Sequence, residues 1–243
     1  MIKYVFFDLD GTLLPMDQDL FIKIYFSELT KVFVAHGCDP KEFFDSLMRS
    51  INLMIANKSN DMNETIFWDC IRNDLGIEEK DVEDEIEAFY NGAFENARSA
   101  CSCNPLVKKT VDILKAKGKH LIVATNPVFP SIASEIRMQW GGVYPSDFEH
   151  ITTYSNSKRC KPEVEYYSHL AEKFGCDPKE CIMVGNDVAD DMPARKAGWN
   201  VFLLTDCLIN RKNVDISVYP NGDFNSLLEH VEFLDTCDRG EEQ

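Results

Sequence analysis

The chain has 243 residues, 44% hydrophobic and 27% charged, so it is long enough to fold around one large or two modest hydrophobic cores. Its 41 acidic side chains outnumber the 25 Lys and Arg side chains, which gives a formal net charge of -16. This charge repels phosphate backbones and anionic lipid surfaces, so we expect neither nucleic acid nor a membrane as a partner.

The cysteines and the N-terminus indicate the compartment. The nine cysteines are an odd number, include one close pair, Cys101 and Cys103, and show no zinc-ligand spacing. No signal-peptide pattern opens the chain, and no run approaches the roughly 20 apolar residues that cross a bilayer. We therefore expect reduced thiols in a soluble, cytoplasmic protein.

The first predicted element is a buried strand over residues 3–8, which leads into the sequence DLDGT at positions 8–12. Over residues 17–98 the apolar side chains recur at helical spacing instead, which predicts about four helices. The aromatic side chains of this helical segment are expected to form its own core. They are Phe43, Phe44, Phe67, Trp68, Phe89, Tyr90 and Phe94.

From residue 104 onward, predicted helices and short apolar strands alternate. The helices are expected at residues 106–117, 131–140, 163–174, 192–197 and 224–234, and the strands at 120–124, 181–184, 201–204 and 216–219. Residues 235–243 are expected to form a frayed tail. Such alternation is typical of a parallel sheet that is covered by helices on both faces.

These elements predict an α/β fold, a doubly wound parallel sheet with an inserted all-helical domain. The sheet domain is expected to comprise residues 1–15 and 101–243, and the helical cap residues 16–100. Because the insertion follows the first strand, the cap would lie over the crevice where open parallel sheets bind ligands.

Polar side chains follow several of the predicted strands, and the ends of parallel strands meet at one edge of the sheet. Asp8 and Asp10 follow the first strand, and Asp187 follows the strand that ends at Gly185. Three carboxylates can be ionised together there only if a cation neutralises them. Carboxylate oxygens suit Mg²⁺, which also accepts phosphate oxygens and water as ligands.

Four motifs in this order resemble the haloacid dehalogenase superfamily, and specifically its phosphoglycolate-phosphatase-like branch with a helical C1-type cap. They are DLDGT at 8–12, a strand ending in Thr125 and Asn126, Lys161 before a helix, and the acidic run at 185–191. The resemblance implies a Mg²⁺-dependent hydrolase of phosphoric monoesters that acts on a small phosphorylated metabolite through an aspartyl-phosphate.

The resemblance also implies roles for individual residues. Asp8 would be the nucleophile and a metal ligand, and Asp10 the general acid and base, with its carbonyl facing the metal. The expected phosphate-binding residues are Leu9, Thr125, Asn126 and Lys161, and Lys161 would balance the charge on the transferring group.

The acidic motif leaves an ambiguity, because Asn186 stands where the family usually has Asp. We expect Asp187 to be a direct metal ligand and Asp191 to lie behind it, with Asp190 as the alternative to Asp191.

Other functions stay open from sequence. A phosphomutase, a phosphonatase or a 2-haloacid dehalogenase would share the fold, although a dehalogenase needs no acid at position 10. A non-enzymatic phospho-receiver domain also combines acids, Thr and Lys around Mg²⁺, but it lacks an inserted helical domain. The sequence does not indicate the substrate or the oligomeric state.

Overall fold

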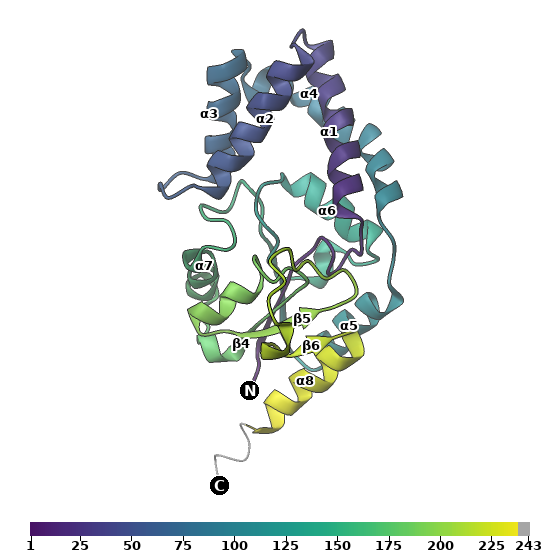
Figure 1. The fold of residues 1–243 in the computed structure, drawn as a ribbon, viewed down its shortest axis with the longest axis vertical. Coiled ribbons are helices and arrows are strands. Elements are labelled where there is room, and N and C mark those ends of the chain that lie inside the picture. The colour runs from purple at the N-terminus through teal and green to yellow at the C-terminus, as the bar shows by residue number, and fades with distance from the viewer. Residues whose placement is uncertain (238–243) are drawn as a thin grey trace.

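The computed structural model describes residues 1–237, in which a six-stranded parallel sheet lies below a unit of helices (Figure 1). The strands lie in the order β3-β2-β1-β4-β5-β6. Their bounds are β1 Tyr4–Phe7, β2 His120–Val123, β3 His150–Ile151, β4 Cys181–Gly185, β5 Asn200–Leu204 and β6 Asn221–Gly222. Every neighbouring pair is parallel, which confirms the predicted α/β class.

Alternate side chains of β1 enter two separate cores, as the period of a strand requires. Val5 and Phe7 point into the core that is shared with α5 and α8, and Phe6 points into the core on the side of α7. The covering helices are α5 Pro105–Ala116, α6 Ser131–Trp140, α7 Val164–Phe174 and α8 Phe224–Cys237. Short 3₁₀ helices are η3 Pro145–Asp147, η4 Pro178–Glu180, η5 Met192–Ala197 and η6 Ile216–Val218.

The sheet domain differs from the expectations at its two edge strands. The predicted strand at 216–219 is the 3₁₀ helix η6, and the edge strand is the two-residue β6 that follows it. The sequence also gave no indication of β3, because two residues are too few to show alternation. Residues 192–197 are helical within the predicted bounds, as the 3₁₀ helix η5.

The predicted tail, residues 235–243, begins before helix α8 ends. Helix α8 continues to Cys237, and the carboxylate of Asp235 accepts hydrogen bonds from the Ile2 N–H at 2.9 Å and from Lys119 Nζ at 2.5 Å. These contacts join the end of α8 to the start of β1. Residues 238–243, the rest of the predicted tail, lie outside the described residues.

The helical unit follows β1 and ends just before α5. It consists of α1 Gln18–Ala35, α2 Pro40–Ile55, α3 Asn63–Leu75, η1 Glu79–Asp81, α4 Glu83–Tyr90 and η2 Ala93–Ala100. Asp39 caps α2 by accepting the N–H groups of Lys41 and Glu42, and Pro40 occupies the first helical turn. Gly76 ends α3 in the left-handed conformation, with φ of 69°.

The seven aromatic side chains that were expected to form the core of this unit divide into three groups. Phe43, Phe89, Tyr90 and Phe94 are buried, as expected for core residues. Phe44 is 41% exposed, which contradicts its expected place in the core. Phe67 and Trp68 are half-buried and line a cavity that faces the sheet domain.

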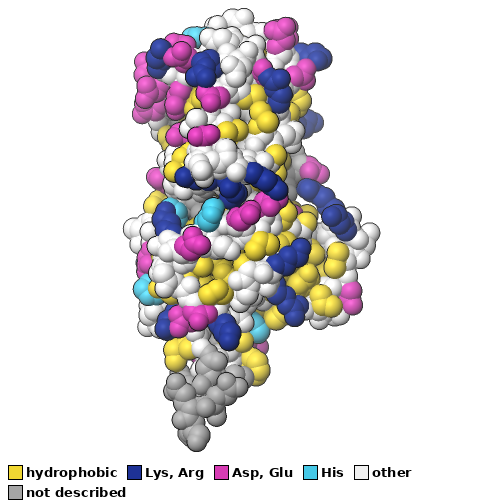
Figure 2. Space-filling model, turned by 90° about the vertical axis from the view of Figure 1, so that its left-hand side faces the viewer, with side chains coloured by type: hydrophobic (Ala, Val, Ile, Leu, Met, Phe, Trp, Pro, Cys, Tyr) yellow, Lys and Arg dark blue, Asp and Glu magenta, His cyan; other side chains and the backbone are white. Residues whose placement is uncertain are grey.

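The helical unit is hydrogen-bonded to loops of the sheet domain at the start of α3. The N–H of Asn63 donates to Ser157 O at 2.9 Å, and its side-chain amide donates to Pro127 O at 3.0 Å. Arg159 donates to the carbonyl of Ser59 at 2.7 Å. In Figure 2, Lys and Arg side chains gather along this junction, between the helical unit above and the sheet domain below.

Among residues 1–237, every helix is too short or too polar to span a bilayer.

Candidate active site

The candidate site begins where β1 ends, at Asp8. The N–H of Asp8 donates to Val184 O at 2.9 Å, so this carboxylate lies beside the end of β4. The chain then turns at Gly11, which has φ of +81°, and a Cβ there would lie 2.3 Å from Nδ2 of Asn186. Glycine is therefore required both by the backbone conformation and by the close approach of Asn186.

Asn186 joins two loops of the site. Its Oδ1 accepts a hydrogen bond from Thr12 Oγ1 at 3.0 Å, and its Nδ2 donates to Cys207 O at 2.7 Å. The sequence alone shows Asn186 only as a departure from the acidic motif. Its buried amide instead fixes the turn after β1 against the turn after β4.

Lys161 lies at the centre of the site, with its side chain only 1% exposed. Its Nζ donates to Asp8 Oδ1 at 2.9 Å and to Asp191 Oδ1 at 2.7 Å. Burial alone would lower the pKa of Lys161, but the carboxylates of Asp191 and Asp8 outweigh burial and raise that pKa well above its ordinary value. Lys161 is therefore a fixed positive charge beside Asp8.

The acidic run after β4 places its three aspartates in different environments. Asp191 is fully buried, and its Oδ2 accepts the N–H of Asp187 at 2.9 Å, while its Oδ1 binds Lys161. A Cβ on Gly185 would lie 2.1 Å from the Asp191 carboxyl group, so only glycine leaves room for it. Burial raises the pKa of Asp191 to about 7, against the opposing effect of Lys161.

Asp187 and Asp190 do not bind Lys161 in this way. Asp187 Oδ1 accepts the N–H groups of Ala189 at 2.6 Å and Asp190 at 3.2 Å, which closes a tight turn. Asp190 is half-buried, and burial and the charge of Asp187 both raise its pKa. Of the two acids that the sequence left as alternatives, the geometry thus joins Asp191, and not Asp190, to Lys161.

Asp10 has a partner that the sequence did not reveal, the buried Arg137 of α6. One guanidinium nitrogen of Arg137 forms an ion pair with Asp10 Oδ2, and its Nε donates to Ala133 O at 3.1 Å. Asp10 Oδ1 is buried without a hydrogen-bond partner. Burial raises the pKa of Asp10, and Arg137 counteracts this rise.

A signal for Arg137 was present in the sequence. Residues 133, 137 and 140 are four and three apart on one face of α6, and this face is buried. A charged residue on the apolar face of a helix requires an opposite charge, and Asp10 provides it.

The loop after β2 carries two of the four predicted phosphate-binding residues, Thr125 and Asn126. Thr125 is buried, and its carbonyl accepts hydrogen bonds from Thr152 Oγ1 at 2.7 Å and from Tyr166 Oη at 2.8 Å. Asn126 Oδ1 is buried without a hydrogen-bond partner. Leu9 is buried, and its carbonyl accepts the N–H of Leu14 at 2.9 Å, which closes the turn after β1.

The oxygen atoms at this edge match the donors that Mg²⁺ prefers. Within residues 1–237, no three His, Cys, Asp or Glu side chains are grouped so that they could hold a metal ion by themselves. If Mg²⁺ binds at this edge, its expected protein ligands are the carboxylates of Asp8 and Asp187 and the main chain of Asp10. This incomplete set fits Mg²⁺, which keeps several waters and takes substrate oxygens into its shell.

Comparison with known proteins agrees with this architecture. The family model of the haloacid dehalogenase-like hydrolases matches residues 2–198, a range that contains every predicted site residue. A pyrophosphatase PpaX of Bacillus velezensis is 26% identical over 194 residues, which cover 80% of this chain and 79% of that protein.

Two further proteins are similar over most of the chain. A phosphoglycolate phosphatase of Haemophilus influenzae is 26% identical over 209 residues, 84% of this chain and 85% of the other. The solved structure of a 2-haloacid dehalogenase from Pseudomonas syringae has a TM-score of 0.61 at 19% identity and covers 96% of this chain and 99% of the other. This last likeness shows the fold.

Proposed function

Because the chain belongs to the haloacid dehalogenase-like hydrolase family, we propose that it is a Mg²⁺-dependent phosphatase that hydrolyses a small-molecule phosphomonoester. The names of the pyrophosphatase and phosphoglycolate phosphatase relatives support phosphatase chemistry. The observation that carries the proposal is Lys161, buried between Asp8 and Asp191 at hydrogen-bond distance from both. The eight cysteines of residues 1–236 carry free thiols, which supports a cytoplasmic setting.

In the first step, an oxygen of Asp8 attacks the phosphorus atom of the ester, and the bond from phosphorus to the ester oxygen breaks. Lys161 balances the charge on the phosphoryl oxygens throughout, since its own charge is held by two carboxylates. Thr125 and Asn126 would bind the same oxygens from the loop after β2. The products of this step are an aspartyl-phosphate and the alcohol.

Asp10 supplies and recovers the proton. Oδ1 of Asp10 has no hydrogen-bond partner in the structure, so this oxygen is available to the leaving group. Burial raises the pKa of Asp10, and the ion pair with Arg137 opposes that rise. After donating its proton, the carboxylate of Asp10 takes a proton from water, which attacks the phosphorus atom. Inorganic phosphate leaves and the carboxylate of Asp8 is regenerated.

Asp8, Asp187 and the carbonyl of Asp10 would hold Mg²⁺, which reduces the repulsion between the nucleophile and the phosphate dianion when it is bound. Asp191 acts indirectly, because it positions Lys161 and the main chain of Asp187. We also propose that residues 16–100 form the cap of this site, since their helices lie above the strand ends that carry it (Figure 1).

Steady-state assays with p-nitrophenyl phosphate test this proposal. We expect phosphate release that requires Mg²⁺ and that is lost in Asp8→Asn. Asp84→Asn, an exposed position on α4, serves as the matched control and should keep full activity. Release of halide from a 2-haloacid without Mg²⁺ would show instead that the chain is a dehalogenase.

A further inference from the structure

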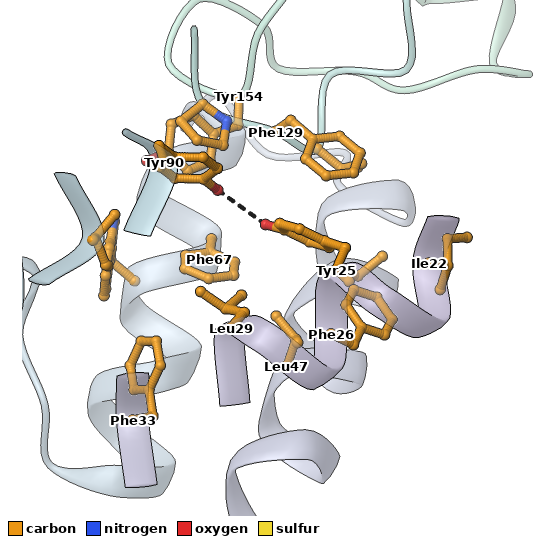
Figure 3. Close-up of a pocket in the computed structure, with 15 residues that line it drawn as sticks. Ile22, Tyr25, Phe26, Leu29, Phe33, Leu47, Phe67, Tyr90, Phe129 and Tyr154 are labelled. Carbon is orange, nitrogen blue, oxygen red and sulfur yellow. Dashed lines mark hydrogen bonds between the residues drawn. The ribbon is translucent and has the colours of Figure 1, made fainter. Parts of the chain in front are cut away.

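A cavity of about 150 Å³ lies between the helical unit and the loop that follows β2 (Figure 3). Helices α1, α2, α3 and α4 form most of its wall, and Val128, Phe129 and Pro130 close the side that faces the sheet domain. These three residues come directly after Pro127 in the loop that begins with Thr125 and Asn126. The same loop thus contributes to the proposed phosphate site and to the cavity.

The fifteen side chains that line this cavity are all aromatic or aliphatic, and none carries a charge. The hydroxyl groups of Tyr25 and Tyr90 point toward one another and form a hydrogen bond of 2.9 Å (Figure 3). Burial raises the pKa of both tyrosines, so both remain neutral. An anionic group would find no compensating charge in this lining.

Two side chains, first Phe129 and then Arg137, lie between the cavity and Asp10. The ring of Phe129 lines the cavity and also packs on Arg137, whose Cζ lies 4.1 Å from the ring centroid. Arg137 in turn forms the ion pair with Asp10, the proposed general acid. The charge of Arg137 is therefore already paired, and the Phe129 ring covers the side of its buried guanidinium group that faces the cavity.

On the basis of the proposed phosphatase function, we propose that this cavity receives the leaving group, and that the preferred substrate is the phosphomonoester of an apolar alcohol with a compact aromatic or branched aliphatic group. Asp10 would protonate the ester oxygen at the inner end, while the apolar part displaces the Phe129 side chain and enters the cavity. An apolar cavity of about 150 Å³ stays dry and is large enough for benzene. Esters with a second carboxylate or phosphate are excluded by the uncharged lining.

Two variants with added bulk test the cavity itself. Leu47→Phe on α2 places a larger side chain into the cavity. Ile51→Phe, one turn later on the same helix, adds the same bulk at a half-buried position and replaces Leu47→Phe if that variant does not fold. Leu53→Phe is the matched control, because Leu53 lies on the same helix but is 45% exposed and does not line the cavity.

Phosphate release is measured for benzyl phosphate, methyl phosphate, 2-phosphoglycolate and pyrophosphate. We expect kcat/KM for benzyl phosphate to exceed the other three values by at least about tenfold. In Leu47→Phe or Ile51→Phe this preference should disappear through a higher KM for benzyl phosphate, with methyl phosphate unchanged. Equal rates for benzyl and methyl phosphate, or equal losses for both in the variants, would overturn the proposal.

A binding measurement separates this proposal from the proposed function. Benzyl alcohol, titrated by calorimetry, should bind the wild type and Leu53→Phe but not the cavity-filling variants. If no ester releases phosphate while benzyl alcohol binds as expected, the phosphatase assignment fails and the apolar site stands. If phosphate is released but benzyl alcohol does not bind, the apolar site is refuted and the phosphatase assignment stands.

Discussion

Lys161 Nζ lies 2.9 Å from Asp8 Oδ1 and 2.7 Å from Asp191 Oδ1, although the three residues come from three separate segments of the chain. The buried ammonium group thus links the strand end that carries the proposed nucleophile to the acidic run after β4. Removing Lys161 leaves the Asp8 and Asp191 carboxylates without this partner, which costs more than an exposed ion pair contributes.

Lys161→Met is expected to lower kcat by about 10²- to 10³-fold, because the charge that stabilises the phosphoryl oxygens is lost. It should also lower the free energy of unfolding by about 3–5 kcal/mol, since Asp8 and Asp191 lose their buried partner. Urea unfolding and steady-state kinetics measure the two effects. Lys109→Met, an exposed position on α5, should change neither, and equal behaviour of the two variants would contradict the role of Lys161.

Asp191→Asn and Asp190→Asn form a matched pair. We expect Asp191→Asn to reduce activity strongly and to destabilise the protein, because Asp191 holds Lys161 and the N–H of Asp187. Asp190 is half-buried and has no such contact with Lys161, so Asp190→Asn should cost much less stability. A larger loss in Asp190→Asn, measured by urea unfolding and by kcat, would reverse this assignment.

Asn63→Ala tests the hydrogen bonds between the helical unit and the sheet domain. The buried Asn63 amide donates to Pro127 O and accepts from Asn57 Nδ2, each at 3.0 Å. Without it, the Pro127 carbonyl and Asn57 lose a partner, and we expect a loss of about 1–3 kcal/mol in the free energy of unfolding. The exposed Asn60→Ala is the control, and similar unfolding curves for both variants would contradict this prediction.

The free energy of unfolding is expected to depend on pH through His150. Burial lowers the pKa of His150 to about 4, and Lys173 acts in the same direction. In the unfolded chain His150 takes up its proton near its ordinary pKa of about 6.5, so stability falls as the pH decreases from about 6.5 toward 4. His150→Gln should lose less stability than the wild type over this range, and parallel losses in urea titrations would refute the contribution of His150.

The sheet class, and the positions of the four motifs next to strands and helices, could be predicted from the sequence because both depend on local signals. Apolar runs indicated the strands β1, β2, β4 and β5. The motif residues lie just after strands, as do Asp8, Thr125 and Asp187, or just before a helix, as does Lys161. The two-residue strands β3 and β6 carried too little pattern to be recognised. Their position depends on pairing with neighbouring strands, which the sequence does not display.

The partners of the site residues could not be predicted in the same way. Arg137 meets Asp10 across 127 positions of sequence, and Asn186 meets Thr12 across 174. Such contacts arise when the strand order brings β1 between β2 and β4, and motif spacing does not encode them. The choice between Asp190 and Asp191 likewise depended on which carboxylate the turn at Asp187 directs toward Lys161.

The assignment of Asp8 as nucleophile is tested most directly by trapping the covalent intermediate. Asp10→Asn should still form the aspartyl-phosphate from p-nitrophenyl phosphate, because p-nitrophenolate leaves without a proton, but it should hydrolyse this intermediate slowly because the group that activates water is lost. After reaction with p-nitrophenyl phosphate and Mg²⁺ and a quench in acid, mass spectrometry of the digested variant should find one phosphoryl group, on the peptide that contains Asp8. Phosphate release without a phosphoryl group on Asp8, or a phosphoryl group on another residue, would contradict the mechanism.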